Sequence, residues 1–241
     1  MKPIPILVVF LASLSSASAA QCGLDTVAHY VASSGCSLGP LIYKGFFYGL
    51  TSFSGNPTLP PLASSSDITV QPTFVAGHPG VNISSSFFSV GLGQAVTYEI
   101  DYTIDPPPII GGQSLEMGSS DSLQDFDFSG GGASVTQYYC VGQGFIVGLA
   151  CADNSVPLSQ QVYFGNTTSF LLSSITFPNT TLLAVKTIIT LDGRDGPVSF
   201  PGFGSGTFDP LSEAPEPITL ALTGTGILGL FLARRKLRAT P

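Results

Sequence analysis

The chain has 241 residues, of which only 10% are charged, whereas Gly contributes 28 residues and Pro 19. A chain poor in Lys, Glu and Arg and rich in turn formers favours many short strands over helices, and its length allows one sizeable core. The formal net charge is −7, which does not suit a nucleic-acid-binding protein, because such proteins carry an excess of basic residues.

The charges are unevenly placed along the chain. Five of the eight basic residues lie in the terminal segments, and all fifteen acidic residues lie between them. The body between the terminal segments, roughly Gln21 to Pro217, therefore carries a formal charge of 3 − 15 = −12. Acidity of this degree keeps an exposed protein soluble and repels anionic polymers and phospholipid head groups.

The first twenty residues have the three parts of a secretion signal. Lys2 provides a positive charge, Ile4–Leu14 is apolar, and Ala17-Ser18-Ala19 supplies small residues for a signal peptidase. The apolar stretch is too short to span a bilayer as a helix. We therefore predict a signal peptide over residues 1–20 and an exported chain that begins near Gln21.

The body, residues 21–203, shows strand patterns at short intervals, separated by clusters of Gly, Pro and Ser. The predicted strands are Tyr43–Phe53, Ile68–Val75, Asn82–Val90, Ala95–Ile104, Ala133–Val141, Phe145–Leu149, Gln161–Phe164, Ser169–Phe177, Leu182–Leu191 and Val198–Phe203. Alternation is clearest over residues 95–104, where one face is apolar and the other carries Thr97, Glu99, Asp101 and Thr103. The pattern predicts an all-β fold, a single antiparallel β-sandwich of the jelly-roll or Ig-like kind.

The four cysteines all lie in the exported body, where the compartment is oxidising. Three pairings are open, of which the pairing of sequence neighbours is the simplest, Cys22 with Cys36 and Cys140 with Cys151. Each disulfide would close a short loop and contribute about 3 kcal/mol on the chain-entropy model. Gln21, rather than a small residue, precedes Cys22, which disfavours a lipoprotein.

The sequence offers few catalytic candidates. His29 and His78 are the two histidines, and no serine occupies a G-x-S-x-G elbow, so turn and surface roles are favoured for both. The chain has no Trp for sugar stacking, and the separation between its carboxylates is not readable from sequence. We expect the protein not to be an enzyme.

Asp121, Asp125 and Asp127 could converge on Ca²⁺, but they lack the pattern of an EF-hand loop, so a solvated acidic loop is favoured. The glycines from Gly224 to Gly229 fit a dinucleotide fingerprint but lie in an apolar tail, outside any βαβ unit. We therefore expect neither a metal nor a cofactor.

The end of the chain has three parts. Residues 204–213 form a predicted linker, and the tail, 214–241, contains the motif Pro215, Glu216 and Pro217. An uncharged stretch at 218–233 follows, about 24 Å long as a helix, which we predict to be transmembrane with help from flanking basic side chains. These basic residues, on the cytoplasmic side by the positive-inside rule, are Arg234, Arg235, Lys236 and Arg238.

This tail resembles the PEP-CTERM sorting signal of Gram-negative bacteria, which combines a Pro-Glu-Pro motif, a Gly-rich apolar helix and an Arg cluster. The same tail is sometimes labelled after ice-binding proteins that carry it. The resemblance implies recognition by an exosortase, removal of the tail near Pro215, Glu216 and Pro217, and release or attachment at the envelope or its exopolysaccharide. The alternative is a permanent single-pass anchor with a chance Pro-Glu-Pro.

Three kinds of function fit these patterns. The first is a non-catalytic component of the cell surface or extracellular matrix, associated with exopolysaccharide. The second is a carbohydrate- or Ca²⁺-dependent adhesion module, which requires an exposed aromatic platform or a filled metal loop. The third is a secreted hydrolase, which requires a cleft where a histidine or two carboxylates meet.

Overall fold

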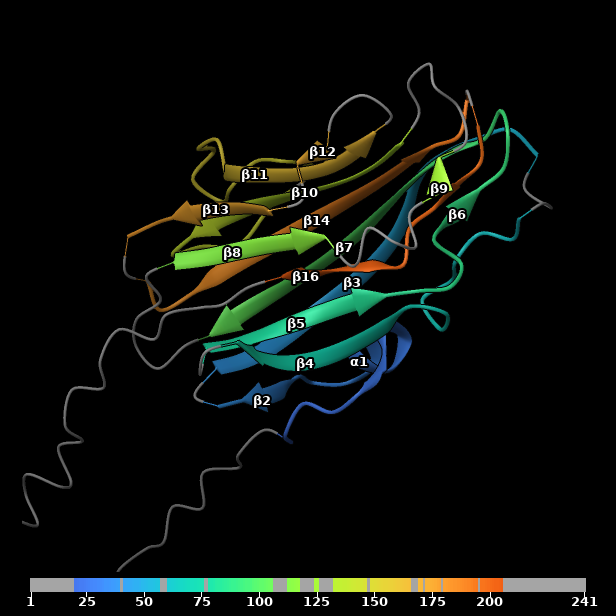
Figure 1. The fold of residues 1–241 in the computed structure, drawn as a ribbon. Helices are drawn as coiled ribbons and strands as arrows, with labels where there is room; N and C mark the ends of the chain where they lie inside the picture. The colour runs from blue at the N-terminus through green and yellow to red at the C-terminus, as the bar shows by residue number, and fades with distance from the viewer. Residues whose placement is uncertain are drawn as a thin grey trace, which may run out of the picture.

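The computed structural model describes residues 20–39, 41–56, 60–75, 78–105, 112–117, 124–125, 132–146, 148–165, 169–170, 172–178, 180–194 and 196–205. In these residues the protein is an all-β sandwich whose sheets are antiparallel, as the sequence predicts (Figure 1). One short helix, α1 (Val27–Ala32), accompanies the strands.

Two large sheets form the sandwich, and a small third sheet joins some of their connections. From edge to edge, the seven-stranded sheet contains β12 (Ser169–Phe170), β11 (Leu158–Gly165), β10 (Gly132–Val141), β14 (Leu183–Asp192), β7 (Ala95–Asp105), β3 (Leu41–Ser54) and β2 (Cys36–Leu38). The six-stranded sheet contains β1 (Asp25–Thr26), β4 (Thr69–Val75), β5 (His78–Ser84), β16 (Gly202–Ser205), β8 (Gly112–Met117) and β13 (Leu172–Thr176). The third sheet contains β6 (Ser89–Val90), β15 (Val198–Ser199) and β9 (Gln124–Asp125).

Four strands of each large sheet follow the strand order of a jelly roll, and the remaining strands extend the edges of the sheets. From β5 onward, the strands of one sheet lie in the order β5-β16-β8-β13 and those of the other in the order β7-β14-β10-β11. Among these eight strands the chain crosses to the other sheet at every connection except that between β10 and β11, which pair within one sheet; this is the double Greek-key arrangement. The strands β3 and β4 extend the two sheets beside β7 and β5.

The core lies between the two large sheets and is built by strict alternation. Every second residue of β7 is buried, from Val96 through Ile104, and the intervening residues point outward. The buried set includes the rings of Tyr98 and Tyr102, and strands of both sheets contribute to the same core cluster. Full burial of such side chains stabilises the fold by about 1.5–3 kcal/mol each.

A buried polar network crosses this core and ties the two sheets together. The Gln137 amide nitrogen donates to Thr187 Oγ1 at 3.1 Å and to Ser205 Oγ at 2.7 Å, and its oxygen accepts from the Tyr139 hydroxyl at 2.6 Å. The Tyr102 hydroxyl lies 3.0 Å from the same Ser205 oxygen. Because Ser205 belongs to β16 and its partners to the opposite sheet, the network fixes how the sheets face each other.

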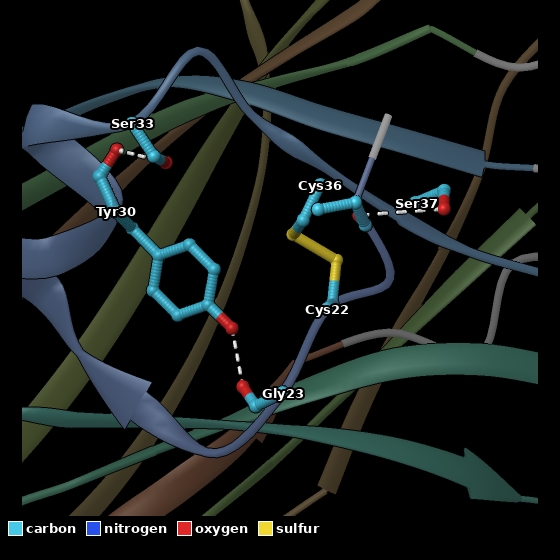
Figure 2. The surroundings of a disulfide bond; sticks show 7 residues. Cys22, Gly23, Tyr30, Ser33, Cys36 and Ser37 are labelled. Carbon is cyan, nitrogen blue, oxygen red and sulfur yellow. Dashed lines mark hydrogen bonds between the residues drawn. A yellow bond between two sulfur atoms is a disulfide. The ribbon is translucent and has the colours of Figure 1, made fainter. Parts of the chain in front are cut away.

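The first disulfide anchors the start of the body. Cys22 and Cys36 are bonded, with 4.8 Å between their Cα atoms, and α1 lies in the loop that they close (Figure 2). Figure 2 also shows the Tyr30 hydroxyl of α1 donating to the carbonyl of Gly23 beside the bridge. The Thr26 hydroxyl caps the helix by accepting from the His29 backbone at 3.3 Å.

The second disulfide, Cys140–Cys151, is also present, so the predicted neighbour pairing is confirmed and accounts for all four cysteines. The predicted strand at Phe145–Leu149 is wrong. In the described part of that segment only Phe145 makes a β-bridge, to Cys151, because the disulfide turns the chain into a closed loop.

Three other predicted strands are split between sheets. Asn82–Val90 divides into β5 and β6, Ser169–Phe177 divides into β12 and β13, and Val198–Phe203 divides into β15 and β16. The strand β16 also includes Gly204 and Ser205, the first two residues of the predicted linker 204–213, because Ser205 is held in the core network. The helix α1 and the strand β8 were not predicted.

Candidate functional site

The outer face of the seven-stranded sheet carries charged, aromatic and hydroxyl side chains close to one another. Since side chains alternate along a strand, the residues of β7 that leave the core all point to this face. The strand register places Asp101 opposite Phe47 on one side and opposite Lys186 on the other, and Lys186 opposite Tyr138. These four side chains form what we call the central row.

Lys186 of the central row holds two carboxylates together on the outer face. Lys186 Nζ donates to Asp101 Oδ2 at 2.7 Å and also to the carboxylate of Glu99, two residues earlier on the same face of β7. The Lys186 side chain is only 8% exposed, so water screens this cluster poorly. The ammonium also lies 5.5 Å from the centre of the Phe145 ring, within reach of a cation–π interaction.

The cluster has one acid more than it has bases. Burial raises the pKa of Asp101 to about 6 despite the hydrogen bond from Lys186, and the neighbouring Glu99 carboxylate acts in the same direction. Burial opposes the charge of Lys186, but hydrogen bonds to the two carboxylates raise its pKa above the ordinary value. The raised pKa of Asp101 and the raised pKa of Lys186 have one explanation. The single positive charge of Lys186 neutralises one carboxylate, and the second carboxylate is able to take up a proton. Asp101 Oδ1 is buried without a hydrogen-bond partner among the described residues, so it is an atom that can hold the proton.

The second disulfide places Phe145 over this face. Cys140 lies beside Ala184 on the outer face, and Phe145 packs against the cluster that these two residues form with Cys151. Two backbone bonds brace the loop, one of them from Ala152 N to the Gly144 carbonyl at 3.0 Å. The ring that meets Lys186 is therefore positioned by a covalent loop.

A β-bulge brings Phe47 to the outer face. Lys44 pairs with Thr103 and Phe47 with Asp101, so three residues of β3 advance against two of β7. Gly45 sits at this irregularity with φ of 62°, a left-handed conformation that glycine adopts readily. As a result Phe46 is buried, whereas Phe47 is 49% exposed.

The Phe47 ring lies over Gly49, which has no side chain to displace it. A Cβ built at Gly49 would lie 3.1 Å from Phe47 Cε1 and 3.2 Å from Cζ. A ring supported in this way on one side and half exposed overall is a preformed apolar platform beside the charged cluster.

A row of hydroxyl groups runs across the same face, two residues along β7 from Glu99. The strand register places Ser52, Thr97, Thr190, Ser134 and Tyr163 opposite one another on five neighbouring strands. Neighbouring strands are about 4.8 Å apart, so the backbone positions of these residues repeat at about that spacing perpendicular to the strands. Tyr163 ends the row with 39% of its surface exposed.

The histidine and calcium candidates of the sequence do not form a site in the described chain. His29 is exposed on α1, and its Nδ1 lies 3.4 Å from Asp25, but no described hydroxyl is hydrogen-bonded to its ring. His78 opens β5 instead of lying in a turn. Asp125 lies in β9, whereas Asp121 and Asp127 lie outside the described residues, and no group of three potential metal ligands occurs among those described.

The terminal signals lie outside the described residues. This holds for residues 1–19 of the predicted signal peptide, for the Pro215, Glu216 and Pro217 motif, and for the basic residues Arg234, Arg235, Lys236 and Arg238. The stretch at 218–233 is among them, and the described part of the chain contains no helix that could span a membrane.

The sequence pattern predicted only some of the residues that lie on the outer face. The alternation over residues 95–104 assigned Glu99 and Asp101 to one outward face. Lys186 has a signal in the sequence, because it is one of three basic residues in the body and interrupts the otherwise uncharged predicted strand Leu182–Leu191. The outward position of Phe47 had none, because simple alternation from the buried Tyr43 assigns it to the core.

Comparison with known proteins gives no family. No protein-family model and no curated protein matches the chain. One similar solved structure is a carbohydrate-binding module in complex with beta-1,4-galactotriose, with 9% identity, a TM-score of 0.27, and coverage of 68% of this chain and 85% of that one. Another is the enzymatically active domain of tailspike protein 4 of bacteriophage CBA120, with 8% identity, a TM-score of 0.26, and coverage of 67% of this chain and 18% of that one. Similarity at this level supports no argument about ligand or activity.

Proposed function

We propose that the protein is an exported, non-catalytic component of the bacterial surface or extracellular matrix, sorted by an exosortase-type enzyme and associated with exopolysaccharide. In this proposal the body is the β-sandwich, the motif Pro215, Glu216 and Pro217 is the processing site, and the apolar helix at 218–233 holds the precursor in the membrane. The signal peptide at residues 1–20 directs export.

The observation that carries the proposal is the pairing of all four cysteines in two disulfides within the body. Disulfides persist in oxidising compartments and are rare in the reducing cytosol, so the body suits the environment to which the terminal signals would deliver it. The order of the three parts of the tail supports sorting rather than simple anchoring.

The surface supports a structural or binding role over catalysis. The carboxylates of Glu99 and Asp101 are both bonded to Lys186, and their side chains are 18% and 21% exposed. Glycoside hydrolysis needs two carboxylates on either side of a bound sugar, one of them free to donate a proton to the leaving group. The arrangement of Glu99 and Asp101 on one strand, two residues apart, does not provide opposite sides.

Mass spectrometry of the protein recovered from its host tests this proposal directly. We expect an amino terminus near Gln21 and a carboxy terminus close to Pro215, Glu216 and Pro217, with an intact mass that contains two disulfides. A carboxy terminus still at Pro241 would contradict sorting and favour a permanent anchor. An amino terminus at Met1 would contradict export through a cleaved signal.

A further inference from the structure

We propose that the outer face of the seven-stranded sheet binds a neutral linear polysaccharide that runs along β3 and β7 and stacks on the Phe47 ring. This inference rests on the proposed function for the location of the protein, outside the cell, where such a polymer is met. It names the face, the side chains and the chemical class of the ligand.

The Phe47 ring supplies the stacking surface. It is half exposed, and it lies against Gly49, which brings it close to the sheet. The apolar face of a pyranose ring, which presents C–H groups, packs against an aromatic ring in the way that other apolar surfaces do. The chain has no Trp, so this role falls to Phe and Tyr on this face.

The charged cluster next to the ring supplies hydrogen-bonding groups for sugar hydroxyls. Phe47 pairs with Asp101 across the strands, and Gly49 pairs with Glu99, so the ring stands beside both carboxylates. Ionised carboxylates accept hydrogen bonds from hydroxyl donors more strongly than neutral groups do. Lys186 holds both carboxylates in place, which limits the ordering that binding would require.

The hydroxyl row gives the direction of the polymer. Ser52, Thr97, Thr190, Ser134 and Tyr163 lie opposite one another across five strands, so they form a line perpendicular to the strands. Thr97 lies four residues along β7 from Asp101, the residue opposite Phe47, so this line is about 13 Å from the ring along the strands. A ligand that stacks on Phe47 and also reaches these hydroxyl groups therefore runs along β3 and β7, and it must be a polymer of several sugar units, not a single compact sugar.

Charge decides which polysaccharide fits. The body carries a formal charge of −12, to which the cluster beside the ring contributes two carboxylates and one lysine. A polymer rich in uronate, sulfate or phosphate would be repelled both over distance and at the cluster. The face is therefore suited to an uncharged polymer.

Affinity electrophoresis tests the inference with the protein as recovered from its host. The full exported protein is run in native gels that contain hydroxyethylcellulose, β-1,4-galactan, dextran or the neutral polysaccharide fraction of the host, with alginate as the anionic comparison. We expect retardation by at least one neutral polymer and none by alginate. Free migration in all four neutral gels would overturn the proposal, and so would retardation by alginate alone.

Three variants distinguish binding at this face from non-specific binding to the gel polymer. Phe47→Ala removes the platform, and we expect binding to weaken roughly tenfold or more, as for an aromatic anchor at an interface. Gly49→Ala keeps the ring but forces it to shift, because the new Cβ lies 3.1 Å from the ring, and we expect a several-fold loss. Phe87→Ala removes another exposed Phe, outside the seven-stranded sheet, and we expect no change.

The outcomes separate this inference from the proposed function. Binding that survives Phe47→Ala, or that falls as much with Phe87→Ala, refutes the proposed face, provided that circular dichroism shows the variants to be folded. The termini measured by mass spectrometry report on export and sorting whatever the gels show. A processed protein without retardation would therefore overturn only the polysaccharide inference.

Discussion

The charged cluster of the outer face makes a quantitative prediction about Lys186→Met, which removes the ammonium but keeps a side chain of similar length. The Lys186 side chain is 8% exposed and bonds two carboxylates, so the substitution leaves Glu99 and Asp101 facing each other without compensation. Breaking a buried pair by removing one partner costs about 3–5 kcal/mol. We expect the lower end of that range at pH 7, since Asp101 is able to take up a proton.

The cost should depend on pH with a defined sign. The raised pKa of Asp101, about 6, means that the folded protein holds this proton more tightly than the unfolded chain does. Protonation of Asp101 therefore stabilises the fold as the pH falls from 7 toward 5, and this contribution is lost as the pH rises through about 6. In Lys186→Met the carboxyl holds its proton still more tightly, so we expect the destabilisation to be smaller at pH 5 by about 1 kcal/mol.

Urea unfolding at pH 7 and pH 5, followed by circular dichroism, measures both quantities. Lys44→Met is the matched control, because Lys44 pairs with Asp105 on the same face but its side chain is 44% exposed. For this exposed pair we expect a loss of no more than about 1 kcal/mol. A Lys186→Met loss equal to that of the control, or a larger loss at pH 5 than at pH 7, would refute the reasoning.

Three further substitutions probe the rest of the sandwich. Replacing Cys140 and Cys151 together by Ser opens a disulfide with a sequence separation of 11, and we expect urea unfolding to show a loss of about 3 kcal/mol; an unchanged midpoint would contradict this. Gly202→Ala places a Cβ 2.4 Å from the Ile83 carbonyl oxygen at a φ of 145°, so we expect the melting temperature to fall by more than about 6 °C. A near-native melting temperature would contradict the close backbone contact between β16 and β5. Gln137→Leu leaves buried hydroxyl groups without their shared partner, which we expect to cost about 1–3 kcal/mol in urea unfolding, and a neutral result would show that the network does not stabilise the fold.

Local patterns in the sequence were sufficient for the fold class and for the disulfides. The alternation over residues 95–104 corresponds to the observed strand β7 with the predicted faces, because the two-residue period of a strand is a local property. Cys22–Cys36 and Cys140–Cys151 pair with their sequence neighbours, for which the chain needs little long-range order. The terminal signals are likewise readable as linear patterns, and their processing stays a prediction.

The outer face, in contrast, exists only through pairings between distant strands. Asp101 and Lys186 are 85 residues apart, and only the register of β7 against β14 makes them neighbours. The bulge at Gly45 depends on the pairing of β3 with β7, and it alone reverses the faces of Phe46 and Phe47. A one-residue change of register moves every following side chain to the opposite face. The sequence by itself therefore determined the alternation that makes these strands, whereas which side chains meet on the sheet was decided by tertiary structure.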